Sequence, residues 1–171
     1  MRRIEEWAGG GLDSTMRFDA SNPGCPLDER AATAVVDAAI DVHRALGPGL
    51  LESVYESCLE YELLSRGFAV RRQTPMSVAY RGFRLEGGFR LDLVVDSCLV
   101  VEIKAVEMLN ELHRAQLITY LRLGRFRLGL LLNFNVSRMT NGIRRVINSG
   151  APCESQSAGP AMIKIEDNFE R

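Results

Sequence analysis

The sequence predicts an α/β fold in which helices flank a mixed central sheet. Helical periodicity occupies the segments 27–46, 51–66 and 110–124, whereas strand-like alternation fills the segment 69–104. A nearly unbroken apolar run, RLGLLLNF, follows the third helical segment, as is typical of a strand that is buried on both faces. The switch between these two periods is what predicts both kinds of element in one domain.

The composition is that of one domain of ordinary size. The chain has 171 residues, of which 46% are hydrophobic and 25% are charged. We expect a single domain over residues 27–148, between a flexible extension at 1–26 and a flexible tail at 149–171, because both ends lack periodicity. No stretch approaches the ~20 apolar residues of a membrane span, so we expect a cytoplasmic protein without a membrane partner.

The charge distribution limits how the chain could meet nucleic acid. The net charge is −1 and the pI is about 6.2, so any contact with nucleic acid must use a local basic patch. Nineteen basic residues are Arg and two, Lys104 and Lys164, are Lys. Clustered arginines could form a phosphate-binding surface, although scattered solvated arginines are the default interpretation. They occur at Arg71-Arg72, Arg81-Arg84-Arg90, Arg122-Arg125-Arg127 and Arg144-Arg145.

The first two helices are separated by a strong stop signal. Apolar residues recur at helical spacing in the first of them, at Leu27, Ala31, Val35, Ala39, Val42 and Leu46. Gly47, Pro48 and Gly49 then end that helix, because glycine caps a helix and proline cannot continue its hydrogen bonds. The second helix, about 51–66, ends at Gly67.

The strand region begins at Ala69 and continues to Lys104. Breaks are expected at Gly82 and at Gly87-Gly88, which suggests a run of antiparallel strands. The third helix and the apolar strand follow, and a short element at 143–147 closes the domain. The four cysteines are too widely scattered for a CxxC metal pair, and we expect reduced thiols. They are Cys25, Cys58, Cys98 and Cys153.

The segment FRLDLVVDSCLVVEIKA carries the most information about chemistry. In an antiparallel hairpin centred on Ser97, residues whose numbers sum to 194 face each other, so Asp92 is placed opposite Glu102. Alternation puts Lys104 on the same face as both carboxylates. The opposite, apolar face is expected to be core and consists of Leu91, Leu93, Val95, Leu99, Val101 and Ile103.

A hairpin with a solvated charged face is the alternative interpretation of this pattern. Three observations favour a functional site. Glu102 and Lys104 interrupt a very apolar run, and Lys104 is a lysine in a chain that uses arginine at almost every other basic position. In the helix that follows, Gln116 and Tyr120 lie four residues apart on one face and could reach the same edge of the sheet.

An Asp, then Glu-x-Lys one strand later, then Gln-x-x-x-Tyr on the next helix resembles the PD-(D/E)XK nuclease superfamily. Upstream, Gly49-Leu50-Leu51-Glu52-Ser53-Val54-Tyr55 resembles the Gly-x-x-Glu-x-x-Tyr signature of the GxxExxY proteins, a bacterial family placed in that superfamily. The resemblance covers roughly residues 32–146 and implies a restriction-endonuclease-like core. Leu91 stands where the superfamily's name has Pro, a position at which that Pro is often absent.

The resemblance also implies a role for each matching residue. Asp92 and Glu102 would be metal ligands, Lys104 the catalytic lysine, and Glu52 an auxiliary acid. Positioning of nucleic acid or water would fall to Gln116, with Tyr55 and Tyr120 as supporting residues. Mg²⁺, or Mn²⁺ in its place, suits such carboxylate ligands and would activate water for hydrolysis of a phosphodiester bond.

Several alternatives stay open at this point. The chain could be a metal-dependent nuclease, or a nucleic-acid-binding or assembly protein that has kept the fold without the activity. DNA and RNA are equally suitable substrates, and a homodimer or a protein partner is an expectation taken from nuclease architecture. No catalytic role is assigned to either histidine, His43 or His113.

Overall fold

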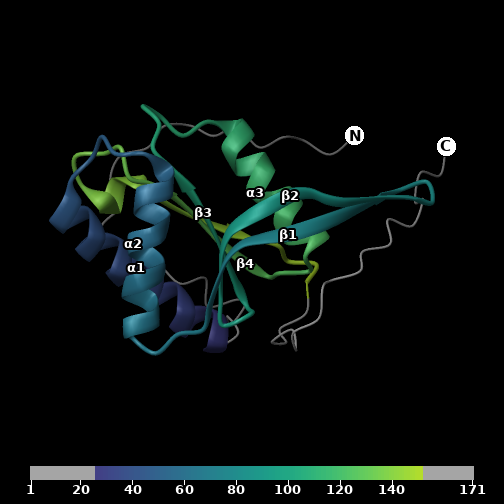
Figure 1. Ribbon diagram of the computed structural model, residues 1–171, viewed down its shortest axis with the longest axis horizontal. Coiled ribbons are helices and arrows are strands. Elements are labelled where there is room, and N and C mark those ends of the chain that lie inside the picture. The colour runs from purple at the N-terminus through teal and green to yellow at the C-terminus, as the bar shows by residue number, and fades with distance from the viewer. Residues whose placement is uncertain (1–25, 152–171) are drawn as a thin grey trace.

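The computed structural model describes residues 26–151, and the predicted extension and tail fall almost entirely outside these residues. Within them, helices lie on both sides of one sheet (Figure 1). The helices are α1 (Pro26–Leu46), α2 (Glu52–Ser65), α3 (Glu111–Leu123) and the short 3-10 helix η1 (Met139–Gly142). No helix in this part of the chain is long and apolar enough to cross a membrane.

The sheet has five strands whose spatial order is their order in the sequence. They are β1 (Val70–Tyr80), β2 (Phe83–Val95), β3 (Leu99–Lys104), β4 (Leu128–Asn133) and β5 (Ile143–Ile147). Neighbouring strands are antiparallel except β3 and β4, which are parallel and are connected through α3. The predicted α/β fold with a mixed sheet is therefore confirmed.

Two apolar cores hold the three layers together. On one face, α1 and α2 cover Leu93, Val101 and Leu130, and the small side chains of α1 allow close packing against the sheet. On the other face, Leu117 and Leu121 of α3 pack on a second set of strand residues. Every residue of β4 is buried, as the unbroken apolar run predicts for a central strand.

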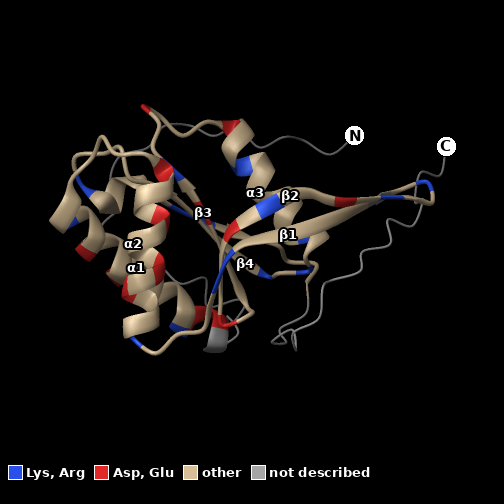
Figure 2. Cartoon of the chain, viewed as in Figure 1, with Lys and Arg blue, Asp and Glu red and all other residues tan. Residues whose placement is uncertain are grey.

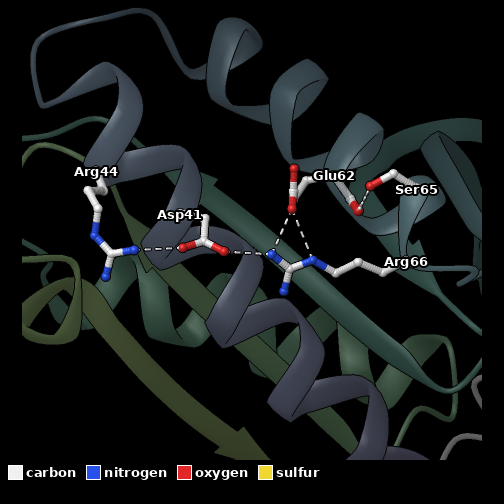
Figure 3. Close-up of polar contacts among 5 residues, drawn as sticks. All are labelled: Asp41, Arg44, Glu62, Ser65 and Arg66. Carbon is white, nitrogen blue, oxygen red and sulfur yellow. Dashed lines mark hydrogen bonds and ion pairs between the residues drawn. The ribbon is translucent and has the colours of Figure 1, made fainter.

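A chain of ion pairs joins α1 to the C-terminal end of α2 (Figure 3). The guanidinium of Arg66 contacts both Glu62 and Asp41, each at 2.7 Å, and Asp41 also contacts Arg44 at 2.9 Å. These groups are partly exposed, so the pairs contribute little to stability individually. They link α1 to the C-terminal end of α2, the helix that carries Glu52.

The turn between β2 and β3 has the register that the sequence predicts. Leu93 pairs with Val101 and Val95 pairs with Leu99, and the residue numbers of each pair sum to 194. Three residues connect the strands, and Asp96 and Ser97, with positive φ of 47° and 57°, are the central residues of a turn that the N–H of Cys98 closes on the carbonyl of Val95 at 3.1 Å.

The expected break at Gly87-Gly88 is wrong, because β2 continues through both glycines and remains paired with β1. Met76 pairs with Phe89 and Val78 with Leu85, so one residue of β1 spans the same length as three residues of β2. Gly87 has a φ of 62°, which a bulge readily uses. The glycines thus mark a bulge within one long strand.

A substitution at Gly129 would test how closely α3 packs on the sheet. A Cβ at this position would lie 2.9 Å from Cδ1 of Leu117 and 3.1 Å from Cδ2 of Leu121. We predict that Gly129→Ala lowers the free energy of unfolding by about 1–2 kcal/mol, because both leucines must leave their preferred packing. Urea denaturation checks this, with Gly150→Ala as the control, since a Cβ there would meet no atom closer than 3.7 Å. Equal stability of the two variants would contradict the prediction.

Candidate active site

The candidate site lies in a fork between β2 and β3. The two strands pair only from Leu93 with Val101 to Val95 with Leu99, and the rest of β2 pairs with β1 alone. Beyond the last pair, the backbone N–H of Ile103 donates to Oδ2 of Asp92 at 2.8 Å. The Asp92 carboxylate therefore occupies the place where a ladder hydrogen bond would otherwise form, and it holds the fork at a fixed width.

Glu102 is the buried acid of this fork. Only 2% of its surface is exposed, and its Oε1 accepts a hydrogen bond from Nζ of Lys104 at 2.7 Å. Its other oxygen, Oε2, has no hydrogen-bond partner among residues 26–151. Burial raises the pKa of Glu102 to about 7, and the charge of Asp92 adds to this effect while Lys104 opposes it. A solvated charged face does not describe this geometry.

Lys104 is held as a cation. Burial lowers the pKa of Lys104, but the hydrogen bond and the charge of Glu102 outweigh burial, so the net pKa lies above its ordinary value. Because the ammonium keeps its proton in this arrangement, it suits stabilisation of negative charge better than abstraction of a proton.

The strand alternation is interrupted at Asp92. Leu91 and Val94 both belong to the core under α3, whereas Leu93 belongs to the opposite core, so the expectation that Leu91 shares a face with Leu93 is wrong. Gln73 lies opposite Asp92, between the pairs that flank it, and has a φ of 49°. This irregular backbone changes the direction in which the side chains of the fork residues project.

A buried acid that the sequence analysis missed supports Asp92 from α2. Glu56 is 5% exposed, and its Oε1 accepts hydrogen bonds from Nε2 of Gln73 and from Nε of Arg72, each at 2.8 Å. The same Nε2 of Gln73 lies 3.5 Å from Oδ1 of Asp92. Burial raises the pKa of Asp92, and the charge of Glu56 adds to that effect. In the sequence, Glu56 follows Glu52 by one helical turn, and this spacing is the signal from which its place near the site could have been predicted.

Glu52 lies at the open end of the fork. Its Oε1 accepts a hydrogen bond from the backbone N–H of Ala105, at 2.9 Å, directly after β3 ends. The residue is exposed, and its charge contributes to the raised pKa values of Asp92 and Glu102. The structure thus brings Glu52 together with Asp92, Glu102 and Lys104.

Tyr55 occupies a different environment from the other predicted site residues. It is fully buried and stacks on Phe134 with ring centroids 4.4 Å apart. Its hydroxyl donates to the carbonyl of Gly47 at 2.7 Å and accepts from the N–H of Leu50 at 3.1 Å. The hydroxyl therefore secures the turn that precedes α2, and it supports the site through the position of that helix.

Gln116 and Tyr120 form a pair on α3. Nε2 of Gln116 donates to the hydroxyl of Tyr120 at 2.6 Å, and the Tyr120 ring stacks on Phe89 of β2 at 4.5 Å. Within residues 26–151, no hydrogen bond or ion pair joins Gln116 to the carboxylates of the fork. The pair thus lies beside β2 without a direct hydrogen bond to the acidic cluster.

The histidines and cysteines have structural environments. His43 Nε2 hydrogen-bonds the carbonyl of Val136 at 2.8 Å, and His113 forms a capping box with Asn110 at the start of α3. Neither Cys58 nor Cys98, the cysteines of the described segment, forms a disulfide. Cys25 and Cys153 lie outside the described residues.

Comparison with models of protein families identifies the superfamily of this chain. The family model described as the PD-(D/E)XK nuclease superfamily matches residues 29–146, well over half of the chain. The chain belongs to this superfamily. No curated protein and no solved structure matches it. PD-(D/E)XK nucleases generally use divalent metal ions, and membership implies a nucleic-acid substrate.

The residues of the fork fit a hard divalent cation. The unpartnered Oε2 of Glu102 and the carboxylate of Asp92 are the hard oxygen donors that Mg²⁺ prefers. No group of three or more His, Cys, Asp or Glu side chains in the described part of the chain is arranged to hold a metal. Mg²⁺ suits such a sparse set, because it commonly binds through one or two carboxylates and keeps several water ligands.

The burial of Glu102 makes the stability of the protein depend on pH. Between pH 4.5 and about 7, the folded protein keeps a proton on Glu102 that the unfolded chain has released. The contribution of this group to stability is therefore complete below pH 4.5 and is lost as the pH rises through about 7. The side chain in Glu102→Gln stays neutral at every pH, so the free energy of unfolding of this variant relative to the wild type should rise by roughly 2–3 kcal/mol from pH 4.5 to 8.

Urea denaturation in EDTA, repeated at several pH values, measures this difference. Glu107→Gln, at an exposed position just beyond β3, is the control and should follow the wild type at every pH. A constant difference between Glu102→Gln and the wild type from pH 4.5 to 8 would show that Glu102 is not the group that titrates.

Removal of the Tyr55 hydroxyl should lower the stability of the protein while the aromatic ring keeps its packing. Tyr55→Phe keeps the ring on Phe134 but leaves the carbonyl of Gly47 and the N–H of Leu50 without their partner. We expect the free energy of unfolding to fall by about 1–3 kcal/mol. Tyr61→Phe is the matched control, because Tyr61 is 73% exposed on the same helix. If both changes have the same effect, the hydroxyl of Tyr55 does not hold the turn.

Proposed function

We propose that this protein is a Mg²⁺-dependent nuclease that hydrolyses phosphodiester bonds in DNA or RNA at the fork between β2 and β3. The observation that carries the proposal is the buried carboxylate of Glu102, which has one oxygen on Lys104 and the other without a partner. A purely structural ion pair would be expected to satisfy both oxygens, because an unpaired buried polar atom is costly. A site that receives a cation and a phosphate explains the unpaired oxygen.

Each side chain of the fork has a part in this proposal. Asp92 and Glu102 would hold the cation, and Lys104 would stabilise the negative charge that develops on the phosphate. Glu52 would act as an auxiliary acid at the open end of the fork, where it contacts the N–H of Ala105. When bound, the cation supplies an activated water and neutralises phosphate charge.

Residues outside the fork complete the proposal. We assign substrate positioning to Gln116 and Tyr120, and a supporting role to Tyr55 through the turn at Gly47. Mn²⁺ could replace Mg²⁺, because both accept carboxylate and water oxygens. We further propose that residues 27–148 form the nuclease-like domain, and that Gly49, Glu52 and Tyr55 place the chain among the GxxExxY proteins.

Cleavage assays test the proposed reaction directly. Single- and double-stranded DNA and RNA are incubated with the protein in Mg²⁺, in Mn²⁺ and in EDTA. We expect cutting that requires the cation and that falls by about 100-fold or more in Asp92→Asn and in Lys104→Ala, because each change removes a charge that acts on the transition state. Asp37→Asn, at an exposed position on α1, is the matched control.

The outcomes separate the nuclease from a binding protein that has kept the fold. Cutting that persists equally in both fork variants comes from another source, and the proposal fails. Binding of nucleic acid without any cutting would favour the nonenzymatic alternative.

A further inference from the structure

The hairpin of β1 and β2 extends beyond the body of the protein as a two-stranded arm (Figure 1). We define the arm as residues 77–90, in which β1 and β2 pair only with each other. Phe83 at its tip pairs with Tyr80, which is seven residues along β1 from Gln73, the residue opposite Asp92, so the tip lies about 23 Å from the fork. A two-stranded ribbon has little stability of its own in water, and this one projects beyond the helices.

One face of the arm is apolar and uncovered. Tyr80 pairs with Phe83, and Val78 pairs with Leu85, so these four side chains share a face by their alternation along the strands. Tyr80 is 62% exposed and Phe83 is 66% exposed. The face continues the core under α3, where Phe89 stacks on Tyr120. No helix of the described residues covers it beyond that stack.

The arm also carries arginines, of which Arg84 and Arg90 alternate with Phe83 and Phe89 and therefore project from its other face. Arg81 lies over the ring of Tyr80 at 5.4 Å, and Arg90 is exposed at the base of the arm. Arg84 pairs with Glu86, the one acidic residue between 77 and 90. The arm therefore carries three arginines against one acid, in a chain whose net charge is −1. Figure 2 shows basic segments at the tip of the arm and again near its base.

We infer that the arm binds the nucleic-acid strand that leads into the fork, with unpaired bases stacked on Tyr80 and Phe83 and phosphates on the arginines. This inference rests on the proposed function and extends it to the choice of substrate. Exposed aromatic rings accept any base by stacking, and arginine neutralises the backbone between them. Charge favours this occupant over a second copy of the chain, since two copies would bring basic arms together.

The geometry also sets a length for the substrate. At about 3.4 Å for each phosphate of a stacked strand, the distance from fork to tip corresponds to roughly seven nucleotides. A strand shorter than this cannot occupy the fork and the tip at once. The arm should therefore contribute to the binding of a 20-nucleotide strand and contribute nothing to that of a 5-nucleotide strand.

Fluorescence anisotropy with fluorescein-labelled DNA and RNA strands, with and without Mg²⁺, tests the inference. The double variant Tyr80→Ala/Phe83→Ala should bind the 20-nucleotide strand at least tenfold more weakly than the wild type and bind the 5-nucleotide strand equally. Tyr80→Trp/Phe83→Trp should restore binding. The matched control is Tyr61→Ala, which removes an equally exposed ring from α2. Arg81→Gln should reduce the salt dependence of binding by about one phosphate contact.

Four results would overturn the inference. One is wild-type affinity of the double variant for the long strand, and the nuclease proposal would stand if cutting continued. Another is an equal loss of affinity for a blunt duplex, because stacking on unpaired bases would then not be the cause. A third is a change in sedimentation without a change in binding, which would make the arm an interface between copies.

The fourth is a wild-type chain that binds no strand at all, which would overturn the nuclease proposal as well. Binding that depends on the arm, in a protein that cuts nothing, would instead support the arm and reject the nuclease.

Discussion

The burial of one carboxylate, that of Glu102, is the constraint on which the rest of the structure depends. An ionised carboxylate in a protein interior is strongly destabilising unless it is paired, and the surrounding sheet offers it a single hydrogen bond from Lys104. The fold nevertheless places this residue in β3, where the strand pairs with β4 on one side and opens from β2 on the other. The acid is thus held in the buried centre of the sheet, next to the point where the pairing of β2 with β3 ends.

The opening of β2 from β3 follows from the residues at the fork. The carboxylate of Asp92 accepts the N–H of Ile103, and Gln73 adopts a left-handed conformation on the neighbouring strand. Such a conformation is unfavourable for a residue other than glycine and persists where surrounding contacts enforce it. Here Glu56 supplies that contact from α2. A helix packed on one face of the sheet therefore determines the shape of a site at the edge between two strands.

The sequence was sufficient for the elements and for the hairpin register, because both depend on local patterns. Alternation and a hairpin centred on Ser97 predict which residues face each other in β2 and β3, and the pairs from Leu93–Val101 to Val95–Leu99 agree. It was not sufficient for Leu91 or for Glu56. Leu91 changes face because of an irregularity on another strand, and Glu56 reaches Asp92 through Gln73, so both depend on contacts between distant segments. The prediction of a strand break at Gly87 and Gly88 was wrong for a similar reason, because pairing with β1 outweighed the preference of these glycines for a turn.

The order of the strands has a consequence for how the chain acquires its structure. Because the spatial order of the sheet repeats its order in the sequence, each strand pairs with the one synthesised immediately before it. The hairpins of β1 with β2 and of β2 with β3 close over short turns, whereas β4 follows α3 and β5 follows the short helix η1. The sheet can therefore grow one strand at a time as the chain leaves the ribosome, with both strands of the arm synthesised before α3 and β4.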